Sequence, residues 1–272
     1  MTPPHVQIRG DGFLTDDVVR RLATRPGVNE ALVHTVADTV QFATTLLSRV
    51  SMSRQETAEE KQKIIALVML VRLVEVAESI FILAAHGIRQ ELHSLFRIFL
   101  DAYFLLANVS SDPGFVPVYF RTDAHARLKL MRAASKRDDE LFKELNDYAT
   151  AEVCDELDRK IKQERIEAFN SFVFAHRVGC ENIYDSMYRL CSSSVHSSPR
   201  CLEEYVDTDA DGNIVVIIHS GDNESIHRVL YDTQYFLMKA LRGVHEIFAL
   251  AEDEALLALD SRREAAMKHY EP

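Results

Sequence analysis

Four polar residues recur at every fourth position through an otherwise apolar segment. Arg89, His93, Arg97 and Asp101 stand in and beside residues 92–106, which read LHSLFRIFLDAYFLL. On a helix, residues four apart share a face, so these side chains form one stripe in which Arg97 and Asp101 are neighbours. A buried arginine needs a partner. The pair is therefore either a structural ion pair that fixes helix register or part of a polar cavity that holds an anion.

A second group of reactive side chains precedes a predicted helix break. Residues 188–199 read YRLCSSSVHSSP, with Arg189 and His196 two helical turns apart and Pro199 just beyond. A histidine here could exchange protons near neutral pH, and an arginine could bind a phosphate through two hydrogen bonds. The alternative is that His196 satisfies backbone carbonyls at the end of the helix.

The segment from Arg189 to His196 resembles the R-φ-x(4–6)-H motif of the HEPN superfamily of helical bundles. Many of its members are metal-independent endoribonucleases of toxin and antiviral systems, and two motifs usually meet across a dimer. The resemblance implies that Arg189 steadies the scissile phosphate and that His196 assists attack by the 2′-hydroxyl. The position after the arginine is usually Asn, Asp or His, but here it is Leu190, so one orienting polar group is missing.

A longer pattern resembles an uncharacterised bacterial family of all-helical proteins of unknown function. That family pairs an R-x-x-x-[DE] helix, here Arg97 to Asp101, with a later S-x-x-x-H segment, here Ser192 to His196. The resemblance covers residues 64–202. Arg97 and Asp101 would either support Arg189 and His196 or stabilise the core nearby. The polar stripe adds His93 and Arg89 as candidate cavity-lining residues, and the sequence leaves open whether the two groups share one site.

One basic segment runs against the acidic balance of the chain. The sequence has 31 basic and 42 acidic side chains and a formal charge of −11, which argues against a broadly basic nucleic-acid surface. Residues 121–137 nevertheless carry six basic side chains beside one aspartate. This segment is either a solvated helix face or the place where nucleic acid would contact the chain. In the second case the contacting residues are Arg121, Arg127, Lys129 and Arg132.

Motifs for metals and cofactors are weak or missing. Asp207, Asp209, Asp211 and Gly212 spell the start of an EF-hand loop, but its twelfth position falls on Ile218 instead of glutamate. We therefore expect a polar hairpin turn there. The sequence contains no H-E-x-x-H, P-loop, G-x-G-x-x-G or G-x-S-x-G motif. The prediction is no metal site and no cofactor.

The elements that must position these residues are mostly helices. Nine glycines and seven prolines are few for this length, so little of the chain is available for turns. Apolar spacing and caps predict helices over residues 15–24, 27–52, 56–85, 88–109, 117–136, 138–148, 151–178, 180–195 and 224–254, followed by a charged tail. Two β-rich runs around D-G-N predict a hairpin. The expected fold is an all-α multi-helix bundle with one inserted β-hairpin near residues 204–222.

The chain is long enough to bury one large core, so we expect a single helical domain. It would comprise a short arm (1–14), a bundle (15–203), the hairpin (204–222) and a long helix with its tail (223–272). Four cysteines without a C-x-x-C pair, and an N-terminus without an apolar signal core, predict a cytoplasmic protein. Arg72, Glu75 and Glu78 interrupt the most apolar stretch, residues 64–85, so no membrane association is expected.

Two functional hypotheses follow. The first is a HEPN-like, metal-independent endoribonuclease effector of a bacterial defence or toxin system, which acts on RNA as a homodimer. Its catalytic residues would be Arg189 and His196. The second is a non-catalytic helical protein that senses a small anionic ligand or a protein partner. In that case Arg97, Asp101 and His196 are core polar groups, and replacing them lowers stability.

Overall fold

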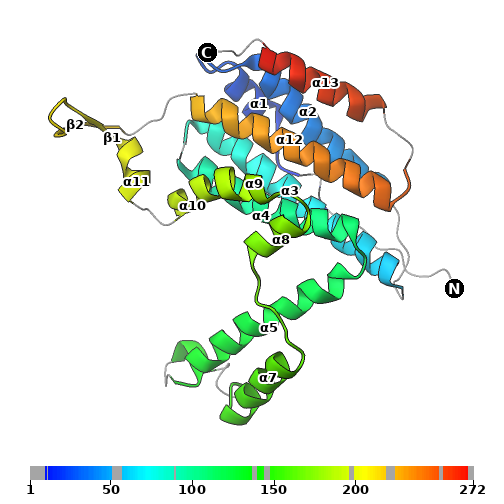
Figure 1. Ribbon diagram of the computed structural model, residues 1–272. Coiled ribbons are helices and arrows are strands. Elements are labelled where there is room, and N and C mark those ends of the chain that lie inside the picture. Colours follow the sequence, from blue (N-terminus) through cyan, green and yellow to red (C-terminus); the bar gives the residue numbers. More distant parts are fainter. Residues whose placement is uncertain are drawn as a thin grey trace.

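The computed structural model describes residues 10, 12–50, 57–88, 90–136, 140–143, 148–195, 199–218, 224–250 and 254–268. Over these residues the chain is a helical bundle, and its strands form one two-stranded antiparallel hairpin. The predicted fold class is therefore confirmed. Two parts project from the bundle in Figure 1. One is an arm built from α5 (Phe115–Ala134) and α7 (Ala151–Gln163), and the other is the hairpin of β1 (Val206–Thr208) and β2 (Ile214–Ile217).

The centre of the bundle is α4 (Gln90–Ser111), which is apolar on nearly every side. It packs against α3 (Ala58–His86), α12 (Glu224–Ile247) and α10 (Arg189–Val195). Phe96, Phe99 and Phe104 are among the largest fully buried side chains. A helix that is apolar all round must be covered by neighbours on several sides, and these three helices cover α4 in this way.

Helix α4 is also long and apolar enough to cross a membrane by length and composition, the one such helix among the described residues. In that window, 61% of the residues are buried inside the bundle. The burial comes from the neighbouring helices that pack on α4.

Local signals set the ends of α3. Thr57 and Glu60 form a capping box, in which each side chain accepts a hydrogen bond from the other residue's backbone N–H. At the other end Gly87 has a φ of 72°, the left-handed conformation that ends many helices. The remaining N-terminal helices, α1 (Asp16–Ala23) and α2 (Glu30–Arg49), pack on α3 and on each other.

The continuous helix expected over residues 151–178 is wrong. Helix α7 ends at Gln163, and α8 (Ser171–Arg177) begins seven residues after Glu164. Arg165 adopts a φ of 51°, which breaks the helix, and the Asn170 side chain caps α8 by accepting from the Phe172 N–H. The chain must turn here because α7 packs on α5 in the arm, whereas α8 packs on α4 in the bundle.

The expectation of a charged tail after one long C-terminal helix is also wrong. Helix α12 ends at Ile247, and the tail forms α13 (Glu254–Lys268), which packs on α2 and α12. Its apolar residues Leu256 and Leu259 are buried. Arg263 is buried too, and it donates to Asp260 and to the Tyr231 hydroxyl. Because Arg263 is paired in this way, its charge is compatible with burial in a packed helix.

The helix expected over residues 180–195 forms with an irregular middle. It comprises α9 (Glu181–Ile183), a π-helical turn (Tyr184–Tyr188) and α10. Beyond it, α11 (Pro199–Leu202) and a 3₁₀ turn (Glu203–Tyr205) lead into the hairpin. The helix expected over residues 138–148 falls largely outside the described residues. Only a 3₁₀ turn (Glu140–Phe142) is seen there.

The hairpin turn is the polar turn that the sequence predicts. The Asp209 carboxylate accepts hydrogen bonds from the backbone N–H groups of Asp211 and Asn213, at 3.0 and 2.8 Å. Strand β2 pairs with β1 in the register Val206 to Ile217. All four of its residues are exposed, so the hairpin buries little of its apolar surface.

Candidate functional site

Arg97 lies where α4 meets α10, and other residues hold its guanidinium on three sides. Its Nε donates to the Ser192 hydroxyl at 3.1 Å, and one Nη lies 3.6 Å from an Asp101 carboxylate oxygen. Its guanidinium carbon stands 4.9 Å from the centroid of the Tyr188 ring, a cation–π distance. The Arg97 and Asp101 side chains are 26% and 22% exposed. The pair is thus neither fully buried nor freely solvated.

Asp101 joins two further elements to this arginine. The Ser171 hydroxyl on α8 donates to one carboxylate oxygen. The Tyr188 hydroxyl lies 3.4 Å from the other oxygen and 3.2 Å from the Ser171 hydroxyl. Burial raises the pKa of Tyr188 above its usual value, so this phenol stays protonated and serves as a donor. We call Arg97, Asp101, Ser171, Tyr188 and Ser192 the Arg97 network.

Local backbone geometry explains how one short segment supplies two members of the network. The π-helical turn ends at Tyr188, and single π turns inside α-helices are frequent at functional sites. One turn later, the Ser192 hydroxyl donates to the Tyr188 carbonyl at 2.8 Å. Its proton is committed to that bond, so its oxygen is left as the acceptor for Arg97.

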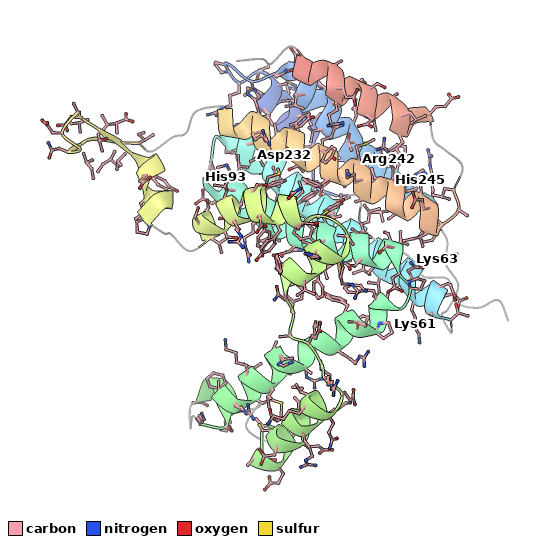
Figure 2. The ribbon with its side chains drawn as sticks, viewed as in Figure 1. Lys61, Lys63, His93, Asp232, Arg242 and His245 are labelled. Atoms are coloured by element: carbon pink, nitrogen blue, oxygen red, sulfur yellow. The ribbon has the colours of Figure 1, made fainter. Side chains whose placement is uncertain are left out.

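A pocket of about 460 Å³ lies beside the network, among α4, α10 and α12. Its polar lining includes His93 from α4, Ser193 and Ser194 from α10, and Arg228 and Asp232 from α12; Figure 2 labels His93 and Asp232. Arg228 Nε stands 2.7 Å from a carboxylate oxygen of Asp232. Burial raises the pKa of Asp232, and the nearby arginine offsets only part of that effect.

Cys191 also lines this pocket, but its chemistry makes it a poor nucleophile. Burial raises the pKa of its thiol to about 12, so almost none of it is thiolate at neutral pH. The cysteines described as free, Cys154, Cys180 and Cys191, are buried or half-buried, as expected of small core side chains.

The predicted catalytic pair is placed only in part. Arg189 follows Tyr188 directly, but its side chain is 65% exposed and pairs with Asp185, with Nε 3.0 Å from the carboxylate. Its guanidinium also stacks over the Tyr184 ring, 5.7 Å from the centroid. His196 and Arg89 lie outside the described residues. The structure thus brings Arg97, Asp101 and Ser192 together and directs Arg189 to an acidic partner on its own helix.

The four basic residues proposed for nucleic acid lie on α5 in the projecting arm (Figure 1). Three of them have partners: Arg127 lies 4.0 Å from Asp123, Arg132 lies 3.4 Å from Asp158 on α7, and the Arg121 side chain donates to a backbone carbonyl. Lys129 is exposed. Part of the basic charge of this helix is therefore neutralised within the arm.

Several site residues were missed at the sequence level. The sequence could have indicated Tyr188. It lies four residues before Ser192, the same spacing that places Arg97 and Asp101 on one helix face. Ser171, Arg228 and Asp232 reach the site only through tertiary packing and had no local signal. No group of three or more metal-ligating side chains occurs in the described part of the chain.

Comparison with known proteins identifies a family. The model of a family described only as a family of unknown function (DUF5677) matches residues 63–214. The matched range contains every member of the Arg97 network, whereas Arg228 and Asp232 of the pocket lie beyond it. No curated protein and no solved structure matches the chain significantly.

Proposed function

The chain belongs to the DUF5677 family of unknown function, and we propose that it is a HEPN-like, metal-independent endoribonuclease whose phosphate-binding residue is Arg97. One observation carries this proposal: Arg97 bonds to Ser192 at 3.1 Å. That bond joins the R-x-x-x-D helix to the S-x-x-x-H segment, the two halves of the pattern that resembles the uncharacterised helical family. The ribonuclease activity is proposed from the resemblance of Arg189 to His196 to the HEPN motif, which puts the phosphate-binding role on Arg189. Because Arg189 pairs with Asp185, we assign that role to Arg97.

The Arg97 network suits an electrostatic role. Ser192, Asp101 and the Tyr188 ring hold the guanidinium in one orientation while about a quarter of the side chain stays open to solvent. A donor fixed before the reaction stabilises charge that develops on a phosphate without further reorganisation. Asp101 is in turn held by Ser171 and Tyr188. These contacts make Asp101, Ser171 and Tyr188 positioning residues for Arg97.

The proposed reaction is an internal transesterification of RNA. The 2′-oxygen attacks phosphorus and loses its proton to a base, while the bond to the 5′-oxygen breaks and that oxygen takes up a proton. The products are a 2′,3′-cyclic phosphate and a 5′-hydroxyl. The proton-transfer group is His196, four residues after Ser192, an assignment that rests on the sequence. By the resemblance to the HEPN superfamily the protein would act as a homodimer in a bacterial defence or toxin system. The cytoplasmic location and the contacts of α5 with the RNA backbone rest on the expectations from the sequence.

A second function is favoured by how completely the network is paired. Arg97 and Asp101 between them have contacts from α8, the π-helical turn and α10. Such a network also suits a non-catalytic interaction or ligand-sensing protein in which these groups fix the helix packing. If the protein is non-catalytic, replacing Arg97 lowers the free energy of unfolding, and the wild type has no RNA-cleaving activity.

RNA cleavage by the full-length protein in excess EDTA separates the two functions. The endoribonuclease proposal expects cleavage by the wild type, and it expects little or none by His196→Ala and Arg97→Lys. A lysine keeps the charge but cannot reproduce the planar, multidentate contacts of arginine. Arg20→Lys, the same change at an exposed arginine of α1, is the matched control. Thermal melts of each variant show whether it is folded.

Each outcome decides between the alternatives. No cleavage by the folded wild type refutes the endoribonuclease proposal and favours the non-catalytic function. Arg189→Ala is a further test. If it abolishes cleavage while Arg97→Lys does not, the phosphate-binding residue is Arg189 and our assignment is wrong. Cleavage that persists in folded His196→Ala removes the histidine from the mechanism.

A further inference from the structure

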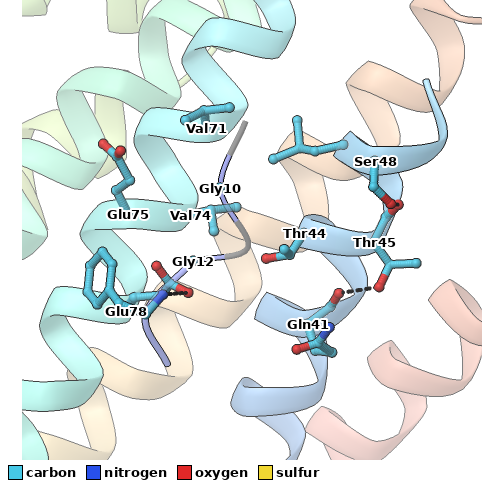
Figure 3. A pocket seen from close by; sticks show the side chains of 12 residues that line it. Gly10, Gly12, Gln41, Thr44, Thr45, Ser48, Val71, Val74, Glu75 and Glu78 are labelled. Carbon is cyan, nitrogen blue, oxygen red and sulfur yellow. Dashed lines mark hydrogen bonds between the residues drawn. The ribbon is translucent and has the colours of Figure 1, made fainter. Parts of the chain in front are cut away.

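A second pocket lies away from this site, between α2, α3 and the chain around Gly10 to Phe13. Its volume is about 510 Å³. Figure 3 shows Glu78 on α3 and polar side chains on α2 to either side of the chain at Gly10 and Gly12, and Glu75 on α3 farther from α2. None of the twelve described lining residues is basic. Among the described residues the wall is therefore acidic and polar, and none of them balances it with a positive charge.

The α2 side of the pocket presents hydrogen-bond acceptors. The hydroxyls of Thr44 and Thr45 donate to the carbonyls of Val40 and Gln41, at 3.1 and 2.8 Å. The Ser48 hydroxyl donates to the Thr45 carbonyl at 2.7 Å. Each hydroxyl has one proton, and these three protons are committed to the backbone of their own helix. What remains available from each is an oxygen lone pair.

The α3 side contains a buried carboxyl group with one unsatisfied oxygen. Glu78 is 2% exposed. Its Oε1 accepts from the backbone N–H groups of Phe13 and Leu14, at 3.2 and 3.3 Å. Its Oε2 is buried and has no hydrogen-bond partner among the described residues. A buried acceptor without a donor is costly, so a group that donates to Oε2 would gain free energy on binding.

We propose that this pocket binds the primary ammonium group of an aliphatic amine. An ammonium has three donors and a positive charge, the complement of the carboxylates on α3 and the hydroxyl lone pairs on α2. The Gln41 amide, which also lines the pocket, adds a further oxygen acceptor. The apolar side chains of Phe13, Val71 and Val74, which also line the pocket, fit the methylene stem of such a ligand. A bare metal ion fits less well, because the described residues provide no cluster of three ligating groups.

The ligand must reach Oε2 beside the segment from Gly12 to Leu14, which lies on the Glu78 carboxylate. Gly12 has a φ of 78°, and a Cβ at that position would clash with the Glu78 carboxylate, so the backbone lies directly on this group. The two hydrogen bonds from Phe13 and Leu14 keep the segment there. The entering ammonium therefore takes a place beside Oε2.

Isothermal titration of the full-length protein with 1,4-diaminobutane tests the proposal. We expect binding by the wild type, and binding at least about tenfold weaker to Glu78→Gln, which loses a charged hydrogen-bond acceptor. Glu75→Gln, an exposed lining residue, should also weaken binding. Glu59→Gln, near the start of the same helix and outside the pocket, is the matched control and should bind as the wild type does.

Two further titrants identify the ligand class. The neutral analogue 1,4-butanediol and MgCl₂ should both fail to bind. Absence of diamine binding in the millimolar range, equal binding by Glu78→Gln, or equal binding of the diol or of magnesium would overturn the proposal. If Glu78→Gln does not fold, Glu75→Gln and Thr45→Val decide, and unchanged affinity in both refutes it. Because RNA cleavage plays no part in this measurement, its result is independent of the proposed function.

Discussion

Asp101→Asn is the most direct test of the energetics of the Arg97 network. The substitution preserves size but removes the charge that faces Arg97 at 3.6 Å and weakens the hydrogen bond from Ser171. A hydrogen bond to a charged group contributes about 1.5–3 kcal/mol, and an ion pair that is only partly exposed adds up to about 1 kcal/mol. The asparagine can keep part of the hydrogen bonding. We therefore expect a loss of about 2–3 kcal/mol in the free energy of unfolding.

The chain contains a matched control for this change. Asp185 and Arg189 are also four residues apart on a helix and lie closer together, at 3.0 Å, but their side chains are 56% and 65% exposed. Solvent screening should therefore make Asp185→Asn cost about 0.5 kcal/mol or less, despite the shorter distance.

Urea unfolding followed by circular dichroism measures both variants. At about 2–4 °C per kcal/mol for a protein near this size, Asp101→Asn should also lower Tm by about 4–12 °C. If the two variants lose equal stability, or if Asp101→Asn loses less than about 0.5 kcal/mol, the network does not couple α4 to α8 and α10 as we infer.

Two other variants and one labelling experiment test separate features. Gly12→Ala places a side chain at positive φ against the Glu78 carboxylate. It should therefore lower the free energy of unfolding by at least about 1 kcal/mol. An unchanged urea midpoint would show that the chain at Gly12 is not packed on Glu78. Because burial raises the pKa of Asp232 in the folded state, the wild type should lose stability relative to Asp232→Asn as pH rises from the unfolded value near 4 through the raised pKa. Melts of both proteins over pH 4–8 measure that difference, and parallel curves would contradict it. Because burial raises the pKa of the Cys191 thiol to about 12, it should react with iodoacetamide at pH 7 far more slowly than an exposed thiol. Peptide mass analysis measures the labelling. Rapid labelling of Cys191 would show that the pocket is open to the reagent and that the thiol is activated.

Local patterns were enough to predict most helices, and to predict that Arg97 and Asp101 meet. Their contact depends only on spacing along one helix, which the sequence states directly. The end of α3 was equally readable, because Gly87 adopts the left-handed conformation that ends helices.

Where prediction failed, distant parts of the chain decide the structure. The charged tail becomes α13 because α2 and α12 cover its apolar face and Asp260 and Tyr231 pair with Arg263. The helix over 151–178 breaks because its two halves pack on different partners. Ser171 joins the site for the same reason, since it lies 70 residues from Asp101 in the sequence.

The packing of the arm has a consequence for local unfolding. Leu128, Cys154 and Ile161 are the buried members of a small apolar cluster separate from the main core. Phe115 and Val116, at the start of α5, belong to the main core, whereas the small cluster holds the rest of α5 to α7 with far less free energy than the bundle has. We therefore expect this outer part of the arm to open as its own cooperative unit. Its amide hydrogens therefore exchange with solvent through local openings that leave the bundle closed. A molecule that docks on α5 would slow this exchange in the arm, and protection in the bundle would stay the same.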